Sequence, residues 1–273
     1  METQCGPEGR KKSRKLMGVD IGFAKTGKTT GIACLDGDKL YLSRAGTPWE
    51  SRKAQIPERF RPDIIALDGP LLPRGVHELV HRRCEFTFIQ APFSKRCKPG
   101  LSHYGFGLDL RRAAAEACTQ FGQILAESTL PARGTFVSCH APIVEAFPNA
   151  FLAVLLPEED FQRAPKLKRG KRFDWLYERG VGTGGLKSVL SGELDLPEEV
   201  WCELRAQSDH ELRAALVCLL TAAFAAHGTA SIIGDAEGGW FWLPPFWLWQ
   251  GWARDGLSRA ACKWRSEHVI ESL

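Results

Sequence analysis

The chain has 273 residues, of which 44% are hydrophobic and 25% are charged. This composition is typical of a globular protein with one large core or two small ones, and it excludes fibrous and low-complexity classes. The formal net charge is +4, but residues 1–15 alone carry five basic and two acidic groups, so the rest of the chain is nearly neutral. Affinity for nucleic acid would therefore have to come from local basic patches.

The chain begins with a basic segment and continues as a predicted antiparallel meander. Residues 1–15 contain no apolar stretch, so we expect a disordered basic tail and no signal peptide. Apolar patterning predicts strands over about 16–21, 30–35 and 39–44. The sequence Asp36-Gly37-Asp38 between the last two strands is typical of a hairpin turn.

The glycine-rich turn after the first strand allows two interpretations. Residues Gly22 to Thr29 match the phosphate-loop pattern G-x-x-x-x-G-K-[ST], which requires a helix directly after it. The β-branched residues that follow predict a strand instead, so no helix N-terminus would bind phosphate there. The second interpretation concerns Asp20, because a carboxylate at the end of an apolar strand is unfavourable unless it is paired or bound to a metal.

The rest of the chain alternates between strand and helix patterns, with a second apolar strand that ends in an acidic residue at Asp68. The longest uncharged apolar run, 214–226, is too short to cross a bilayer, so we expect no membrane span. Further strands are predicted over 63–70, 136–139, 143–148, 230–234 and 240–243, and helices over 109–127, 149–156, 173–178, 197–205, 209–227 and after Pro245. This order predicts an α/β fold with a mixed sheet and flanking helices, built as one domain over 16–273 with insertions near 71–108 and 157–195.

Three acidic residues stand at or near the carboxyl ends of predicted strands, namely Asp20, Asp68 and Glu145. If these strands are parallel neighbours, the three side chains meet at the sheet edge where sites in α/β proteins lie. Asp209, in the first turn of the predicted helix 209–227, is a candidate fourth oxygen ligand. Facing carboxylates attract Mg²⁺ or Mn²⁺, and two such ions would support phosphodiester cleavage. The prediction gives catalytic and metal-binding roles to all four residues.

At these positions the chain resembles domain-of-unknown-function family 429, which is regarded as a family of predicted ribonuclease H-like nucleases. The resemblance spans most of residues 16–250 and rests on several short motifs in order. They are Val19-Asp20, Leu67-Asp68-Gly69-Pro70-Leu71, Arg83-Cys84-Glu85, Glu145-Ala146-Phe147-Pro148, His210-Glu211-Leu212, and Gly234-Asp235 through Leu243-Pro244. It implies a ribonuclease H-like fold and a metal-dependent nuclease activity on DNA or RNA.

The chain departs from the family pattern at one position. Family members often carry Asp-Ala where this chain has Arg213-Ala214, and an arginine cannot bind a metal. Asp209 or Glu211 would have to replace that ligand. Both also have structural interpretations, because Asp209 favours the positive end of the helix dipole and Glu211 would close a capping box that begins at Ser208.

Basic residues near the predicted strand ends are candidates for substrate binding. One group flanks the loop after the second acidic strand, where arginine forks match phosphate oxygens, although a solvated basic loop fits equally well. A second group of basic residues precedes Phe173 and Trp175. Proteins that bind single-stranded nucleic acid combine cationic and aromatic side chains in this way. The substrate-binding candidates are Lys25, Lys28, Arg83, Arg96, Lys98, Lys168 and Arg169.

Other interpretations of the sequence stay open. An actin-like ATP-dependent phosphotransferase would use Asp20, the turn over 25–30 and a second loop over 181–185. A catalytically degenerate domain would bind nucleic acid or protein through its basic loops. His81, Cys84, Cys97 and His103 have spacings that suggest zinc. The nine scattered cysteines indicate a reduced, cytoplasmic compartment, and the Trp-rich C-terminal region is a candidate homodimer surface.

Overall fold

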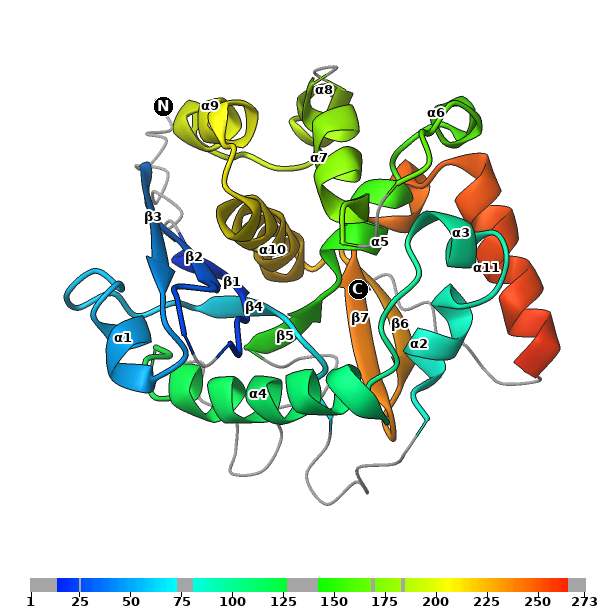
Figure 1. Ribbon diagram of the computed structural model, residues 1–273. Helices are drawn as coiled ribbons and strands as arrows, with labels where there is room; N and C mark the ends of the chain where they lie inside the picture. Colours follow the sequence, from blue (N-terminus) through cyan, green and yellow to red (C-terminus); the bar gives the residue numbers. More distant parts are fainter. Residues whose placement is uncertain are drawn as a thin grey trace, which may run out of the picture.

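The computed structural model describes residues 14–24, 26–72, 81–126, 142–167, 170–182 and 185–264. Within these residues the protein is an α/β fold built on a mixed sheet of seven strands in the order β3-β2-β1-β4-β5-β7-β6 (Figure 1). The strands are β1 (Leu16–Asp20), β2 (Thr30–Asp36), β3 (Lys39–Ala45), β4 (Ile64–Asp68), β5 (Ile143–Ala146), β6 (Ser231–Asp235) and β7 (Gly239–Leu243).

Helices cover both faces of this sheet. One face is covered by α10, with α5, α7, α8 and α9 packed beyond it, and the other by α4 and α1 (Figure 1). The helices are α1 (Trp49–Lys53), α2 (Arg83–Phe88), α3 (Phe93–Arg96), α4 (Gly105–Gly122), α5 (Pro148–Ala153), α6 (Glu158–Gln162), α7 (Arg172–Gly182), α8 (Gly185–Leu190), α9 (Glu198–Ala206), α10 (His210–His227) and α11 (Gly251–Trp264), with a 3-10 helix η2 (Phe246–Leu248).

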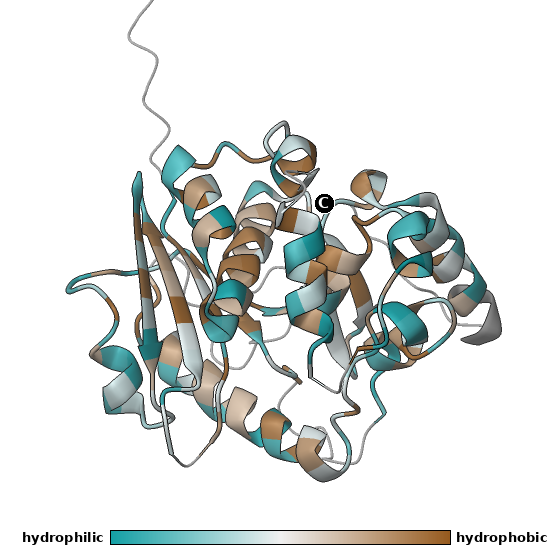
Figure 2. Cartoon of the chain, turned by 45° about the horizontal axis from the view of Figure 1, so that its top comes forward, coloured by the Kyte–Doolittle hydropathy of each residue, from teal (hydrophilic) through white to brown (hydrophobic). Residues whose placement is uncertain are grey.

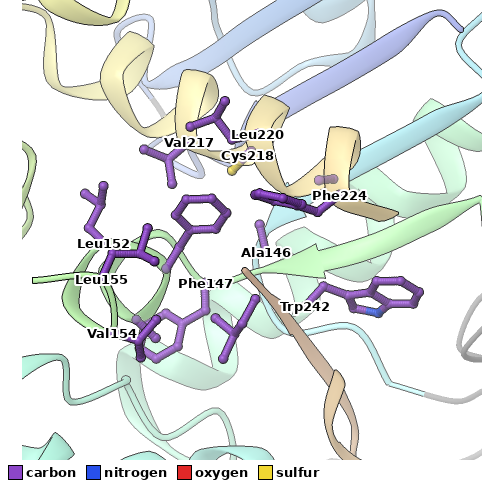
Figure 3. Close-up of a cluster of buried hydrophobic side chains, with 14 of the residues drawn as sticks. Ala146, Phe147, Leu152, Val154, Leu155, Val217, Cys218, Leu220, Phe224 and Trp242 are labelled. Carbon is purple, nitrogen blue, oxygen red and sulfur yellow. The ribbon is translucent and has the colours of Figure 1, made fainter. Parts of the chain in front are cut away.

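The two faces carry separate apolar cores because side chains alternate along each strand. Leu16, Ala66 and Ala146 face α10, whereas Val19 and Leu67 face α4. Apolar residues gather where the helices meet the sheet, and hydrophilic residues occupy the outer surfaces (Figure 2). The core on the α10 face continues across α5 to β7, where Phe147, Leu152, Phe224 and Trp242 lie among the side chains of one cluster (Figure 3).

Helix α10 lies unusually close to β1 and β2, and two glycines make this approach feasible. A Cβ atom at Gly18 would collide with the backbone of Ala215 and Leu219, and one at Gly31 would collide with the carbonyl of Glu211. The helix ends in a left-handed residue, Gly228, at φ 71°. The strand ends and the N-terminal turn of α10 are therefore held together at short range.

The predicted meander is confirmed by β1, β2 and β3, with β1–β2 and β2–β3 both antiparallel. The turn after β1 enters a strand and no helix, which removes the phosphate-loop interpretation of residues 22–29. Buried Arg52 fixes this turn by donating to the Gly22 carbonyl at 2.9 Å and to Gln120 at 2.9 Å. The strand predicted over 136–139 lies outside the described residues.

The tryptophans of the C-terminal region are largely used inside the chain. Trp242, Trp249 and Trp252 are buried, and the indole nitrogens of the last two donate to the carbonyls of Pro244 and Leu156, each at 2.9 Å. Trp247 is the exposed member, with half of its surface accessible. The burial of these three rings leaves the predicted homodimer surface with little exposed aromatic area to support it.

Candidate functional site

Two carboxylates meet at the carboxyl ends of the two central strands. Asp20 and Asp68 are the last residues of β1 and β4, and they are direct partners in the parallel register. Both share the face of Ala66, so they point toward α10. The predicted proximity of Asp20 and Asp68 is therefore confirmed, and their carboxylates lie side by side.

The electrostatics of the pair are those of crowded, partly buried acids. Burial raises the pKa of Asp20 well above its ordinary value, and the neighbouring Asp68, Glu211 and Asp209 raise it further, while Arg44 opposes them. Burial also raises the pKa of Asp68 to about 7, with a contribution from Glu145. Negative charge is therefore unfavourable here without a cation, and such shifts are frequent at functional sites.

The third predicted ligand, Glu145, lies on the opposite face of the sheet. In the β4–β5 register Glu145 pairs with Leu67, while Asp68 pairs with Ala146. Because successive side chains alternate, the Glu145 carboxylate leaves the sheet on the α4 face and away from the Asp20–Asp68 pair. The expectation that these three carboxylates converge on one side is wrong at this residue.

Glu145 is instead the partner of a buried arginine. Arg82 donates to both carboxylate oxygens of Glu145, with Nη1 at 2.8 Å from Oε1, and the Leu71 amide donates to Oε2 at 2.8 Å. Arg82 also pairs with Glu85 at 3.2 Å, whose other oxygen accepts from the Ser102 amide. Burial raises the pKa of Glu145 to about 7, against the Arg82 charge. We interpret this network as a structural clasp between β5 and the segment 82–102.

The fourth predicted ligand, Asp209, has two other partners. It is the N-cap of α10, accepting from the Leu212 amide at 3.1 Å, and it pairs with Arg44 at 2.8 Å. Glu211 pairs with the same arginine at 3.2 Å and does not close a capping box with Ser208. The predicted cap at Ser208 is therefore wrong by one residue.

Arg213, the residue that departs from the family pattern, points away from the carboxylate pair. Its guanidinium lies over the Tyr177 ring and bonds to the Gln207 carbonyl at 2.8 Å and to Glu178 at 3.2 Å. The α10 residues that line the space above Asp20 and Asp68 are His210 and Ala214, one turn apart. Arg213 thus does not obstruct the site.

A cleft of about 440 Å³ opens above the two carboxylates. Its walls come from four parts of the chain: the segment 94–100, the start of α5 with Phe147 and Asn149, the residues 170–173, and the first turns of α10. Volumes of this size are typical of small-molecule sites. The cleft combines an acidic floor, a basic rim and an apolar side.

His210 and Asp174 form a pair at the cleft that the sequence did not reveal. His210 Nδ1 lies 2.7 Å from Asp174 Oδ1, and Phe173 contacts the imidazole with its ring centroid 5.2 Å away. Lys171 holds the same aspartate at 3.0 Å. A carboxylate on Nδ1 fixes the tautomer and the orientation of an imidazole, which leaves Nε2 for other partners. The two residues are 36 positions apart, so no local pattern indicates their contact.

The predicted substrate-binding residues fall into three groups. Lys98, together with Lys95, is exposed at the cleft rim, and Arg96 also lines the cleft. The Arg96 guanidinium, however, lies 4.1 Å over the Trp252 ring and pairs with Glu158. Arg83 pairs with Asp235 at 2.9 Å away from the cleft lining, and Lys28 is exposed outside it. Lys25, Lys168 and Arg169 lie outside the described residues.

The zinc interpretation is not supported by the positions of the cysteines. Cys84 and Cys97 are buried in the apolar core, where burial raises the pKa of both thiols. Across the described ranges, no group of three or more Cys, His, Asp or Glu side chains is placed to hold a metal ion. The four predicted carboxylate ligands, Asp20, Asp68, Glu145 and Asp209, therefore do not form such a group in the described ranges.

The second loop that a phosphotransferase would need also lacks a frame of strands. Helix α7 continues to Gly182 and α8 begins at Gly185, while residues 183–184 lie outside the described part. A glycine-rich loop for phosphates normally joins a strand to another element. The geometry therefore favours the Asp20–Asp68 cleft as the candidate site.

Comparisons with protein-family models, curated proteins and solved structures returned no match. None of the helices in the described ranges is both long enough and apolar enough to span a bilayer.

Proposed function

We propose that the protein is a ribonuclease H-like, metal-dependent phosphodiesterase that acts on nucleic acid. The single observation that carries the proposal is the register pairing of Asp20 with Asp68 beneath a cleft with exposed lysines on its rim. The resemblance to family 429 and the meander followed by parallel β4 and β5 support the same assignment. Fold analogy alone would not suffice, because one fold supports many activities.

The donor set fits a hard divalent cation. Asp20 and Asp68 supply carboxylate oxygens from neighbouring strand ends, and burial together with the neighbouring acids raises the pKa of both carboxyls, so a bound cation would relieve the cost of ionising them. Mg²⁺ and Mn²⁺ prefer oxygen ligands of this kind. A cation held by these two carboxylates would polarise phosphoryl oxygens and make water more acidic. Glu145 and Asp209 are engaged elsewhere, so we assign the cation to the Asp20–Asp68 pair.

The residues around the pair have separate tasks. Lys95 and Lys98 bind backbone phosphates at the rim, and the apolar side of the cleft receives sugar or base. His210, oriented by Asp174, accepts the proton of the attacking water. The water oxygen forms a new bond to phosphorus, the bond to the leaving sugar oxygen breaks, and that oxygen takes a proton from solvent.

The deciding experiment compares wild-type protein with Asp20→Asn on labelled single- and double-stranded DNA and RNA in the presence of Mn²⁺. We expect cleavage by the wild type and none by the variant. Cleavage that survives in Asp20→Asn would come from a contaminant and would refute the assignment. Circular dichroism of both proteins controls for folding.

A second candidate function is binding without cleavage. It is favoured by the lack of a three-residue metal-ligand group among the described side chains. Binding that weakens steeply with salt, together with no Asp20-dependent cleavage in either metal, would establish this alternative.

A further inference from the structure

The walls of the cleft are tied to one another around its mouth. Arg172 Nη1 donates to the Lys95 carbonyl at 2.7 Å, which joins the start of α7 to the segment 94–100. Asp174, two residues further on, bonds to His210 and so joins α7 to the start of α10. Helix α10 in turn packs on β1 and β2 through Gly18 and Gly31. These contacts form an unbroken chain on one side of the cleft.

The wall that carries Lys95 also contacts α6 and α11 on the side away from the cleft. The Arg96 guanidinium lies against Trp252 of α11 at 4.1 Å and against Phe161 of α6 at 5.0 Å. Its ion pair with Glu158 adds a polar link to α6. The segment 94–100 is therefore fixed to the body of the protein and cannot be treated as a freely opening flap.

The space inside this boundary suits a single nucleotide unit. The volume of about 440 Å³ lies in the range of small-molecule sites. The chemistry of the lining agrees with a nucleotide. Lys95 and Lys98 are exposed cations for phosphate, and Phe147 and Phe173 are apolar contacts for a base or sugar.

Asn149 adds a specific polar requirement. Its buried Oδ1 lacks a hydrogen-bond donor within the described residues, and the residue lines the cleft. Because this oxygen has almost no accessible surface, a ligand hydroxyl or amino group reaches it only after the Asn149 side chain turns toward the cleft. Such a hydrogen bond would remove the cost of an acceptor without a donor. Sugars and bases both carry such donors.

We infer that the cleft receives the end of a single nucleic-acid strand, one nucleotide at a time, so that the protein acts as an exonuclease. This inference rests on the proposed nuclease function and deepens it. A strand interior would need two exits from the cleft for the flanking nucleotides, and the contacts of Arg172 with Lys95 and of Asp174 with His210 bridge the walls on one side. A terminal nucleotide needs only one.

The test uses one single-stranded oligonucleotide in two forms, linear and ligated into a circle, with Mn²⁺. We expect the wild type to degrade the linear form to mononucleotides and to cut the circle more slowly by at least about tenfold. Equal rates on both forms would overturn end entry while leaving the nuclease assignment intact. Loss of both activities in Asp20→Asn confirms that the measured rates belong to this site.

A variant that removes one contact between the cleft walls tests whether these contacts control the entry of the strand. Arg172→Ala removes the link to Lys95, so the circle-to-linear rate ratio should rise toward one. Arg163→Ala removes an exposed positive charge outside the cleft lining and should leave this ratio unchanged. If Arg172→Ala changes both rates equally, the tie does not control entry and the inference is wrong.

Binding provides a readout that does not depend on cleavage. Fluorescence anisotropy without metal should give tighter binding of the linear oligonucleotide than of the circle. This result, combined with no cleavage of either form, would refute the nuclease proposal and retain a pocket for strand ends. Equal affinities for the two forms would refute end entry whatever the activity.

Discussion

Asp20 pairs directly with Asp68 across two parallel strands, and both carboxylates leave the sheet toward the N-terminal turn of α10. No positive side chain in the described ranges forms an ion pair with either one. The pair is therefore a centre of unbalanced acidity at the bottom of a cleft, and most of the expected solution behaviour follows from it.

Replacement of Asp68 should stabilise the protein at neutral and higher pH. Burial raises the pKa of Asp68 to about 7, so the folded state holds a proton at pH values where the unfolded chain has lost it. Stability then falls as the pH rises from about 4 to about 7. Asp68→Asn should be more stable than wild type near pH 8 by on the order of 2 kcal/mol, with little difference near pH 3. Urea unfolding between about pH 3 and pH 8 measures the difference in the free energy of unfolding. Asp38→Asn in the β2–β3 turn is the control and should show no such gain.

Mn²⁺ should stabilise the folded wild type, and more strongly at about pH 8 than at about pH 6. The cation binds the carboxylates after they lose their protons, and any ligand of the folded state raises the unfolding temperature. Asp20→Asn and Asp68→Asn should abolish this shift. Glu145→Gln should retain it, because Glu145 lies on the other face of the sheet. A shift that is lost only in Glu145→Gln would mean that the ion site has been assigned to the wrong face.

Glu145→Gln should destabilise the fold. The substitution removes the negative charge that pairs with Arg82, and breaking a buried pair from one side costs about 3 kcal/mol. Thermal or urea unfolding measures the loss. Glu58→Gln, at a side chain that is 92% exposed, should have almost no effect. A change of similar size in both variants would argue against the clasp between β5 and residues 82–102.

Removal of the rim lysines should weaken nucleic-acid binding by a salt-dependent amount. Lys95→Ala and Lys98→Ala should each lower the slope of log affinity against log salt by about 0.7 for a single strand. Arg83→Ala is the matched control, since Arg83 is paired with Asp235 outside the cleft lining. Unchanged slopes for the lysine variants would place the phosphates elsewhere.

His210→Ala should slow cleavage by roughly a hundredfold or more with little change in oligonucleotide affinity. Asp174→Asn should have a smaller effect in the same direction, because it removes only the group that orients the imidazole. Single-turnover rates separate chemistry from binding. His227→Ala, at the exposed C-terminal end of α10, is the control. Wild-type rates in His210→Ala would exclude the histidine from proton transfer.

Local patterns allowed the sequence to predict the meander, β4 and the Asp20–Asp68 pair. Each carboxylate ends an apolar strand, and local patterning locates both strands. Their parallel pairing was a condition of the prediction, and the register shows that this condition is met. The face of Glu145 could not be predicted in this way. A register difference of one residue moves a side chain to the other face, and the pairing of Glu145 with Leu67 is set by tertiary contacts such as the Arg82 clasp.

The pairs that involve α10 were also beyond local patterns. Arg44 on β3 pairs with Asp209 and Glu211 across more than 160 positions, and both acids lie close enough to Asp20 to raise the pKa of its carboxyl. The sequence indicates His210 only as part of a family motif, because its partner Asp174 lies on a different helix. Such long-range contacts depend on the packing of whole helices and strands, so the spacing of residues along the sequence does not predict them.

The close packing of α10 on Gly18 and Gly31 fixes one wall of the cleft in position. The helix cannot slide along β1 without driving backbone into backbone, so His210 and Ala214 keep a constant height above the two acids. The backbone of the opposite wall is held by the Arg172 bond to the Lys95 carbonyl and by the contacts of Arg96, so adjustment to different strand ends must come from its exposed side chains. Selectivity among substrates should accordingly evolve through residues 94–100 and 170–173, while the acidic floor stays unchanged.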